Sequence, residues 1–173
     1  MTHPLVKLMK VLVPPPHPVG TGSPNDWKAL DGRIGVPLPG DYKQFVDTYG
    51  AGTVGDGVWI LSPFEAAAPG TLESALAFHR EAHALRLFEN EPDGMIPWAV
   101  NEDRGACYWE TRDADPDRWT VLAMVEDDLH RWPENMTTFL LRVISGDHKS
   151  SVFGINTVFR PPVRYGAWVP RRY

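Results

Sequence analysis

Cysteine is almost absent from this chain of 173 residues, since Cys107 is the only one. A single cysteine excludes an internal disulfide and does not support an oxidising compartment, so we expect a cytoplasmic location. Long apolar runs are also missing, and none approaches the roughly 20 residues that a membrane span requires. The apolar stretch at 5–13 contains Lys7 and Lys10 and leads into prolines, not into the small residues of a signal-peptide cleavage site. We therefore expect neither a secretory signal nor membrane association.

Motifs that would assign a catalytic activity are missing as well. The glycine-rich run at 50–57 follows a predicted helix and enters a predicted strand, whereas a phosphate-binding loop follows a strand and opens a helix. We therefore expect a conformational role for these glycines. The sequence has no Gly-x-Ser-x-Gly elbow, and its scattered carboxylates do not indicate a general acid/base pair. Cys107 lies within an alternating strand pattern, which is typical of an inert, buried thiol.

Two histidines have the spacing of metal ligands but not the rest of the motif. His79 and His83 are four residues apart on a predicted helix, as in zinc proteases. In those enzymes a glutamate directly follows the first histidine, whereas Arg80 occupies that position here, and no third ligand is evident downstream. We expect both histidines to be exposed, with no metal or cofactor bound. A metal-dependent hydrolase that uses them is the least favoured alternative.

The composition is otherwise that of an ordinary globular protein, with 43% hydrophobic and 23% charged residues. The length fits one domain, and the 17 prolines and 15 glycines indicate many turns and exclude a coiled coil. The formal net charge of -5 does not suit a protein whose whole surface binds phosphate backbones. We therefore expect no direct contact with nucleic acid.

Charge is distributed unevenly along the chain. Residues 81–134 include 14 acidic and 5 basic residues, whereas residues 142–173 include 6 basic residues and one acidic residue. Such asymmetry indicates that one charged surface of the protein is specialised for interaction. The residues that we select as candidates for binding a partner lie in two acidic turns: Glu102, Asp103, Asp113, Asp115 and Asp117. The alternative interpretation is that they are solvated turn residues without a binding role.

Residues 159–173 are rich in basic and aromatic side chains, which could bind the phosphates of a nucleic acid and stack on its bases. They include only four arginines in a chain of negative net charge, whereas affinity for nucleic acid depends on many phosphate contacts. We therefore expect this tail to make intramolecular or protein contacts.

Hydrophobic periodicity predicts helices at both ends of the chain with strands between them. Apolar spacing and capping residues predict three helices at 5–12, 39–49 and 71–88. They also predict a helix that begins at 24 and another that begins after Asn135. In the helix at 39–49, Tyr42, Phe45 and Tyr49 form a stripe that we expect to be buried, and we expect Gly50 to provide a left-handed cap. Strands are predicted at 58–61, 95–100, 106–111 and 119–125, the last three as an antiparallel meander. This order favours an α+β protein.

Several short motifs occur in an order that is more specific than any one of them. They are DW at 26–27, LPGDYKQF at 38–45, YGAG at 49–52, WILSP at 59–63, IPWA at 96–99, YW at 108–109, DRWTV at 117–121 and MTTFL at 136–140. This combination resembles the SUKH superfamily, whose fungal members are cell-wall assembly regulators, and the match spans about 27–153. We accordingly divide the chain into an N-terminal helix and proline-rich linker at 1–22, a SUKH-like domain at 23–153 and the basic aromatic tail at 154–173.

The resemblance implies an α+β fold with a central, mostly antiparallel sheet and helices packed on it. It also implies no enzymatic activity, because the family has no catalytic motif. Bacterial SUKH proteins are chiefly immunity proteins of polymorphic toxin and contact-dependent inhibition systems, and they neutralise a cognate toxin, often a nuclease or deaminase, by binding it. We therefore expect a non-catalytic protein, a monomer or weak homodimer, whose partner is a protein toxin. The alternative is a regulatory scaffold of the fungal type with no toxin partner.

Overall fold

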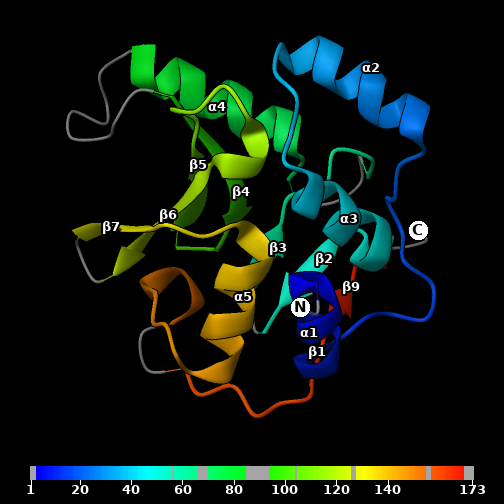
Figure 1. Cartoon of the computed structure of the whole chain (residues 1–173), viewed down its shortest axis with the longest axis vertical. Coiled ribbons are helices and arrows are strands. Elements are labelled where there is room, and N and C mark those ends of the chain that lie inside the picture. The colour runs from blue at the N-terminus through cyan, green and yellow to red at the C-terminus, as the bar shows by residue number, and fades with distance from the viewer. Residues whose placement is uncertain are drawn as a thin grey trace.

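The computed structural model describes residues 3–169, apart from 56, 66–69, 85–93, 104, 126–127 and 155–156. Its helices are α1 (Pro4–Val11), α2 (Pro24–Ile34), α3 (Gly40–Tyr49), α4 (Leu72–Ala84) and α5 (Met136–Ser145) (Figure 1). Its strands are β1 (Leu12–Val13), β2 (Gly52–Val54), β3 (Val58–Ile60), β4 (Met95–Val100), β5 (Ala106–Glu110), β6 (Thr120–Val125), β7 (Asp128–Trp132), β8 (Val163–Arg164) and β9 (Gly166–Ala167). The short 3-10 helices are η1 (Pro116–Arg118) and η2 (Ser151–Phe153).

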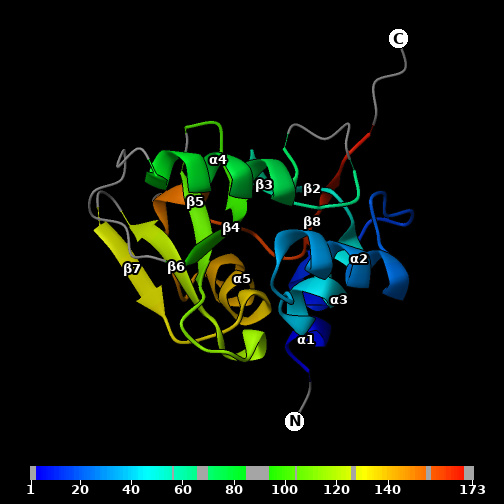
Figure 2. The same cartoon turned by 90° about the horizontal axis from the view of Figure 1, so that it is seen from above.

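A central antiparallel sheet organises the molecule. Over the described residues it has seven strands in the order β7-β6-β5-β4-β3-β2-β9, and the strands from β3 to β7 each pair with the next one in sequence. α4 packs on one face next to β4, whereas α1, α3 and α5 pack together on the other face (Figure 2). The predicted α+β fold with helices packed on a mostly antiparallel sheet is therefore confirmed. Among the described helices, none has the length and apolar character needed to cross a membrane.

Capping residues in the sequence determine where two helices begin. Ser23 and Asp26 form a capping box at the start of α2, in which each side chain accepts a hydrogen bond from the backbone N–H of the other residue, at 3.3 and 2.8 Å. The Asn135 side chain accepts from the Thr138 N–H at 3.0 Å at the start of α5. Both helix starts confirm the sequence prediction.

The end of α3 differs from the prediction of a left-handed cap. Gly50 has a positive φ of 68°, but its ψ of -161° lies outside the left-handed helical region. A Cβ atom at this position would collide with the carbonyl oxygen of Val19, which passes directly beside it. The Ala51 N–H also donates to that carbonyl at 2.7 Å. Glycine is therefore required here by the close approach of the segment before α2 as well as by the backbone angle.

The aromatic stripe of α3 forms the centre of the core, as predicted. Tyr42, Phe45 and Tyr49 have no exposed surface. The Phe45 ring stacks on Tyr49 with centroids 4.4 Å apart, and Tyr42 packs edge-on against Trp109 of β5 at 4.8 Å. Both tyrosine hydroxyls donate to buried backbone carbonyls. These contacts fix α3 against the sheet.

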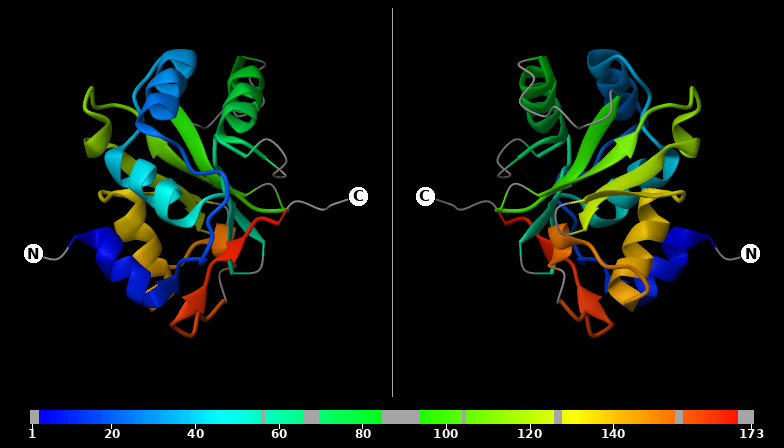
Figure 3. Two further views of the ribbon diagram at one scale, coloured as in Figure 1. Left: turned by 90° about the vertical axis from the view of Figure 1, so that its right-hand side faces the viewer. Right: turned by 90° about the vertical axis from the view of Figure 1, so that its left-hand side faces the viewer.

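The tail joins the fold through short strands that the sequence analysis did not predict. β8 pairs in parallel with β1, and β9 lies beside β2 at the end of the sheet (Figure 3). Between them, Tyr165 is buried and donates its hydroxyl to the Gly50 carbonyl at 3.0 Å. Trp168 packs edge-on against Trp59 with centroids 5.6 Å apart. The tail thus makes intramolecular contacts, and the division of the chain at 22 and 153 stays a prediction.

Candidate binding groove

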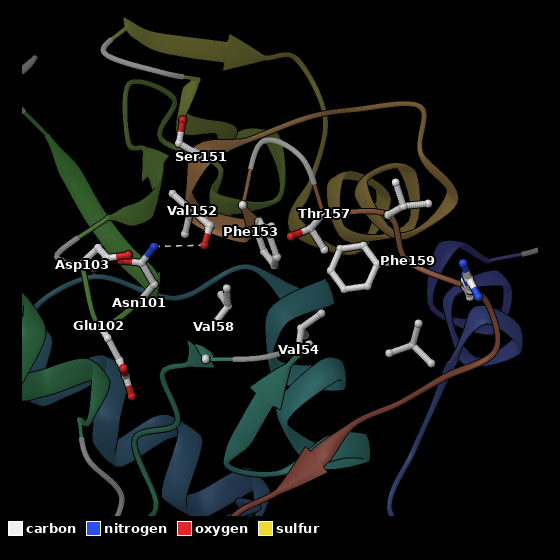
Figure 4. Close-up of a pocket in the computed structure, with 16 residues that line it drawn as sticks. Val54, Val58, Asn101, Glu102, Asp103, Ser151, Val152, Phe153, Thr157 and Phe159 are labelled. Atoms are coloured by element: carbon white, nitrogen blue, oxygen red, sulfur yellow. Dashed lines mark hydrogen bonds between the residues drawn. The ribbon is translucent and has the colours of Figure 1, made fainter.

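A groove of about 820 Å³ opens at one end of the sheet. Four segments surround it: the turn between β2 and β3, the turn between β4 and β5, η2, and the tail before β8 (Figure 4). Its floor is apolar, because Val54, Val58, Val152 and Phe153 line it and are themselves packed into the core. A groove of this size is within the range of ligand pockets in proteins.

The wall at the β4–β5 turn is held in place by Asn101. Its backbone N–H donates to the Gly105 carbonyl at 2.9 Å, and its side-chain oxygen accepts from the Gly105 N–H at 2.7 Å. Its side-chain amide donates to the Val152 carbonyl of η2 at 3.1 Å, which is the dashed line in Figure 4. One side chain therefore closes the turn and connects it to η2, which fixes the position of this wall.

The tail supplies the opposite wall. Phe159 packs on the β2–β3 turn, where a Cβ atom at Gly55 would lie 2.9 Å from the Phe159 ring. Gly55 has a φ of 62°, so both its backbone angle and this contact favour glycine. Thr157, at the start of the wall, donates its N–H to the Gly154 carbonyl at 2.8 Å. The groove is complete only when the tail is in place.

Two of the predicted binding residues lie on this groove. Glu102 and Asp103 line it from the β4–β5 turn, and both are exposed. Neither carboxylate forms a hydrogen bond or an ion pair with any residue that the structure describes. Arg160, which follows Phe159 in the tail, also lines the groove and is exposed. The groove therefore combines an apolar floor with two available carboxylates on one wall and a guanidinium group on the other.

The other three predicted residues lie elsewhere. Asp113, Asp115 and Asp117 belong to the connection between β5 and β6, at the opposite end of β5 from Glu102 and Asp103. The five residues of β5 span about 17 Å at roughly 3.4 Å each. The structure thus separates the five acidic candidates into two surfaces.

The acidic residues of the second surface have local structural roles. Asp113 accepts from the Asp115 N–H at 2.9 Å, and Asp115 accepts from the Asp117 N–H at 3.1 Å. Asp117 accepts from the Gly40 N–H at 2.6 Å, which caps the start of α3 although the two residues are far apart in sequence. These three carboxylates organise the turn and the helix end, so their presence in the sequence does not require a partner.

A second carboxylate, that of Asp41, accepts a hydrogen bond at the start of another helix. Asp41 in the first turn of α3 accepts from the Thr137 N–H of α5 at 2.9 Å. Burial raises the pKa of Asp41, whereas the hydrogen bond from Thr137 acts in the opposite direction. Asp117 thus connects the β5–β6 turn to the N-terminus of α3, and Asp41 connects α3 to the N-terminus of α5.

We expect Asp117→Ala to lower the free energy of unfolding by about 1 kcal/mol, because the substitution removes the cap of α3. The matched control is Glu102→Ala, which removes an exposed carboxylate that makes no hydrogen bond within the described structure, and should leave stability unchanged. Urea unfolding of both variants checks this. Equal stability of the two variants would show that Asp117 does not act as a cap.

The expectation that His79 and His83 are both exposed is wrong for His79. His79 is buried, and its ring lies against Tyr108 of β5 with centroids 5.2 Å apart, because this side of α4 covers the outer face of the sheet. The side chain of His83 lies outside the described residues, as does the predicted end of this helix at 85–88. Within the described part of the chain, no group of three or more His, Cys, Asp or Glu residues is placed to hold a metal ion.

Cys107 is an inert core residue, as predicted. Its side chain has no exposed surface, and burial raises the pKa of the thiol well above its ordinary value. A buried thiol with a raised pKa has little thiolate to act as a nucleophile. The sequence pattern of β5 was sufficient to place this residue correctly.

One buried carboxylate, on the same face of β5 as Tyr108, was not predicted from the sequence. Glu110 is 5% exposed and accepts two hydrogen bonds from Arg131 of β7, at 2.6 and 2.5 Å. Arg112 pairs with it at 2.9 Å, and Thr120 donates to it at 3.2 Å. The hydrogen bonds from Arg131 are the main cause of the lowered pKa of Glu110. With its oxygens engaged in this way, Glu110 fastens β7 to β5 across β6.

The structure is thus an α+β domain with a groove whose walls carry exposed charged side chains. The chain belongs to the SUKH family, because the family model SUKH_6, described as SMI1-KNR4 cell-wall, matches residues 24–140. Members of this family are generally non-catalytic and act through protein–protein interaction. No curated protein is significantly similar to the chain in sequence. Glu102 and Asp103 lie within the matched range, whereas η2 and the tail wall follow it.

Proposed function

We propose that this chain is an immunity-type binding protein that neutralises a cognate bacterial toxin by direct contact through the groove. The observation that carries the proposal is the pair Glu102 and Asp103, which are exposed, make no ion pair with any described residue and stand beside an apolar floor. Toxins that act on nucleic acid, such as nucleases and deaminases, present basic surfaces. A complementary acidic patch speeds association with such a surface and helps to select it.

The geometry supports two of the five carboxylates, Glu102 and Asp103, as residues of the proposed interface. Asp113 and Asp115 accept backbone hydrogen bonds within their turn, and Asp117 accepts one from Gly40 at the start of α3, which accounts for their residue types without a partner. No comparable role within the described structure accounts for Glu102 and Asp103. We therefore place the interface at the groove, and we propose that the protein acts in the cytoplasm as a monomer or weak homodimer within a polymorphic toxin or contact-dependent inhibition system.

A second function is favoured by the description of the matching family model, which refers to the cell wall. In this alternative the chain is a regulatory scaffold, and the groove receives a component of a regulatory assembly instead of a toxin. Genome context separates the two functions. A neighbouring gene with a variable toxin domain at its C-terminus supports immunity, whereas an isolated locus supports regulation.

The proposal is tested by expressing the chain together with the toxin domain encoded beside its gene. We expect the wild-type chain to restore growth and to elute with the toxin domain as a stoichiometric complex. Glu102→Gln with Asp103→Asn should weaken protection, whereas Asp113→Asn with Asp115→Asn should leave it intact. Failure of the wild-type chain both to protect and to bind would contradict the immunity function.

A further inference from the structure

We propose that the groove accepts an extended segment of the partner protein that lays one arginine or lysine side chain across the apolar floor. In this arrangement the cationic head lies against Glu102 and Asp103. The inference deepens the proposed function, on which it rests, by specifying what the partner inserts.

The floor and the acidic wall together match this type of side chain. Lysine and arginine bury a stem of methylene groups along apolar surface while the charged head stays close to water or to an anion. Here Val58 and Val152 lie on the floor, and Glu102 and Asp103 lie at the wall beside them (Figure 4). A purely apolar side chain would leave both carboxylates unused, and a carboxylate would be repelled by them.

The groove is also polarised along its length. Glu102 and Asp103 stand at one side, whereas Phe159 stands at the other (Figure 4). Arg160 follows Phe159 in the sequence of the tail and also lines the groove. A second cationic residue of the bound segment would therefore be unfavourable near Arg160, while an acidic or neutral residue would fit there. This polarity gives the segment a preferred direction, because opposite charges meet in only one of the two orientations.

A nucleic-acid backbone is a poor candidate for the same groove. It needs several cationic contacts to neutralise its phosphates, whereas Arg160 is the cationic residue among the described residues of the lining. The carboxylates of Glu102 and Asp103 would add repulsion. The charge of the groove therefore favours a protein segment with a basic residue.

The experiment uses the full chain and two capped pentapeptides, one with arginine and one with glutamine between leucines and terminal glycines. Amide shifts in heteronuclear NMR spectra report where each peptide binds and how tightly. We expect the arginine peptide to shift amides of 53–55, 101–103, 151–154 and 157–160 and to bind about fivefold more tightly than the glutamine peptide. Equal affinities, or shifts that lie outside these segments, would overturn the inference.

The charge variants provide a matched comparison. Glu102→Gln with Asp103→Asn should reduce the affinity for the arginine peptide about fivefold and leave the glutamine peptide unaffected. Asp113→Asn with Asp115→Asn, at the other end of β5, should change neither affinity. Unchanged binding of the arginine peptide to the first variant would also overturn the inference. Both double variants replace exposed side chains with isosteric ones, so the melting temperature of the protein should be unchanged. The comparison of the two peptides on the wild-type chain does not depend on either variant.

Failure of this inference and failure of the proposed function give different results. If the chain protects cells from the toxin but the arginine peptide does not bind in the groove, the toxin is recognised differently and only the inference fails. If the arginine peptide binds in the groove as described but the chain neither protects nor binds the neighbouring toxin domain, the groove chemistry stands and the immunity function fails.

Discussion

Phe45→Ala should lower the free energy of unfolding by about 3–5 kcal/mol, because it removes a large ring from a packed core and leaves a cavity. Phe45 has no exposed surface, stacks on Tyr49 and meets the edge of Tyr165 from the tail at 5.9 Å between centroids. The substitution therefore disturbs α3 and the packing of the tail together. Urea unfolding followed by tryptophan fluorescence measures the change.

The matched control for this experiment is Phe78→Ala. Phe78 lies on α4 and is 66% exposed, so the same atoms are removed without creating an internal cavity. We expect its effect on stability to be within about 0.5 kcal/mol. Equal losses in the two variants would contradict the central position of Phe45 in the core.

High pH should destabilise the protein strongly, because three buried tyrosines must stay protonated in the folded state. Tyr42, Tyr49 and Tyr165 are buried, and burial raises the pKa of each hydroxyl. In the unfolded chain, tyrosine loses its proton near pH 10. Above that pH the folded state binds more protons than the unfolded state, so stability falls as the pH rises. Cys107 adds the same effect from about pH 8.5.

Each tyrosine adds a slope of about 1.4 kcal/mol per pH unit well above pH 10, so the three together give about 4 kcal/mol per unit, and Cys107 adds about 1.4 more. Urea unfolding at intervals between about pH 8 and pH 11 measures the slope. Tyr165→Phe keeps the ring but removes the ionisable group, and should reduce the slope above pH 10 by about 1.4 kcal/mol per pH unit, which is about one quarter of the total from the three tyrosines and Cys107. The same slope in this variant as in the wild type would show that Tyr165 does not titrate on unfolding.

Local sequence signals were sufficient to predict the longer helices and the strands of the meander. α3 has apolar residues at helical spacing, and α2 has a serine, a proline and an aspartate in the order of a capping box. Local hydrogen bonds and one buried face determine these elements, so their residues carry the information. The meander of β4, β5 and β6 was predicted for the same reason, since each strand is a run of aromatic or apolar residues between clear turns.

The short strands could not be found in this way. β8 and β9 have two residues each and pair with β1 and β2, more than 100 residues away in sequence. Such strands owe their existence to tertiary contacts, here the burial of Tyr165 between them, and not to a local pattern. β7 was missed because its residues are mostly polar, although Arg131 fastens it through Glu110. The groove could not be predicted from the sequence, because the four segments that surround it are distant from one another in the chain.

The division of the acidic candidates into two surfaces was within reach of the sequence. In an antiparallel meander, consecutive turns lie at opposite ends of the strands. Glu102 and Asp103 precede β5 and Asp113 follows it, so the predicted meander already places them apart. The sequence could not show that Asp117 caps α3, because that hydrogen bond depends on how the turn packs.

If a neighbouring gene encodes a toxin domain, the association rate constant of the chain with that domain tests most directly the proposal that the groove is the interface. Stopped-flow measurements at low and at physiological ionic strength compare the wild type with the two double variants. We predict that Glu102→Gln with Asp103→Asn slows association about fivefold at low salt and weakens its salt dependence. Asp113→Asn with Asp115→Asn should match the wild type. Slower association in the second variant, with the first unchanged, would place the interface at the β5–β6 turn and contradict the assignment of the groove.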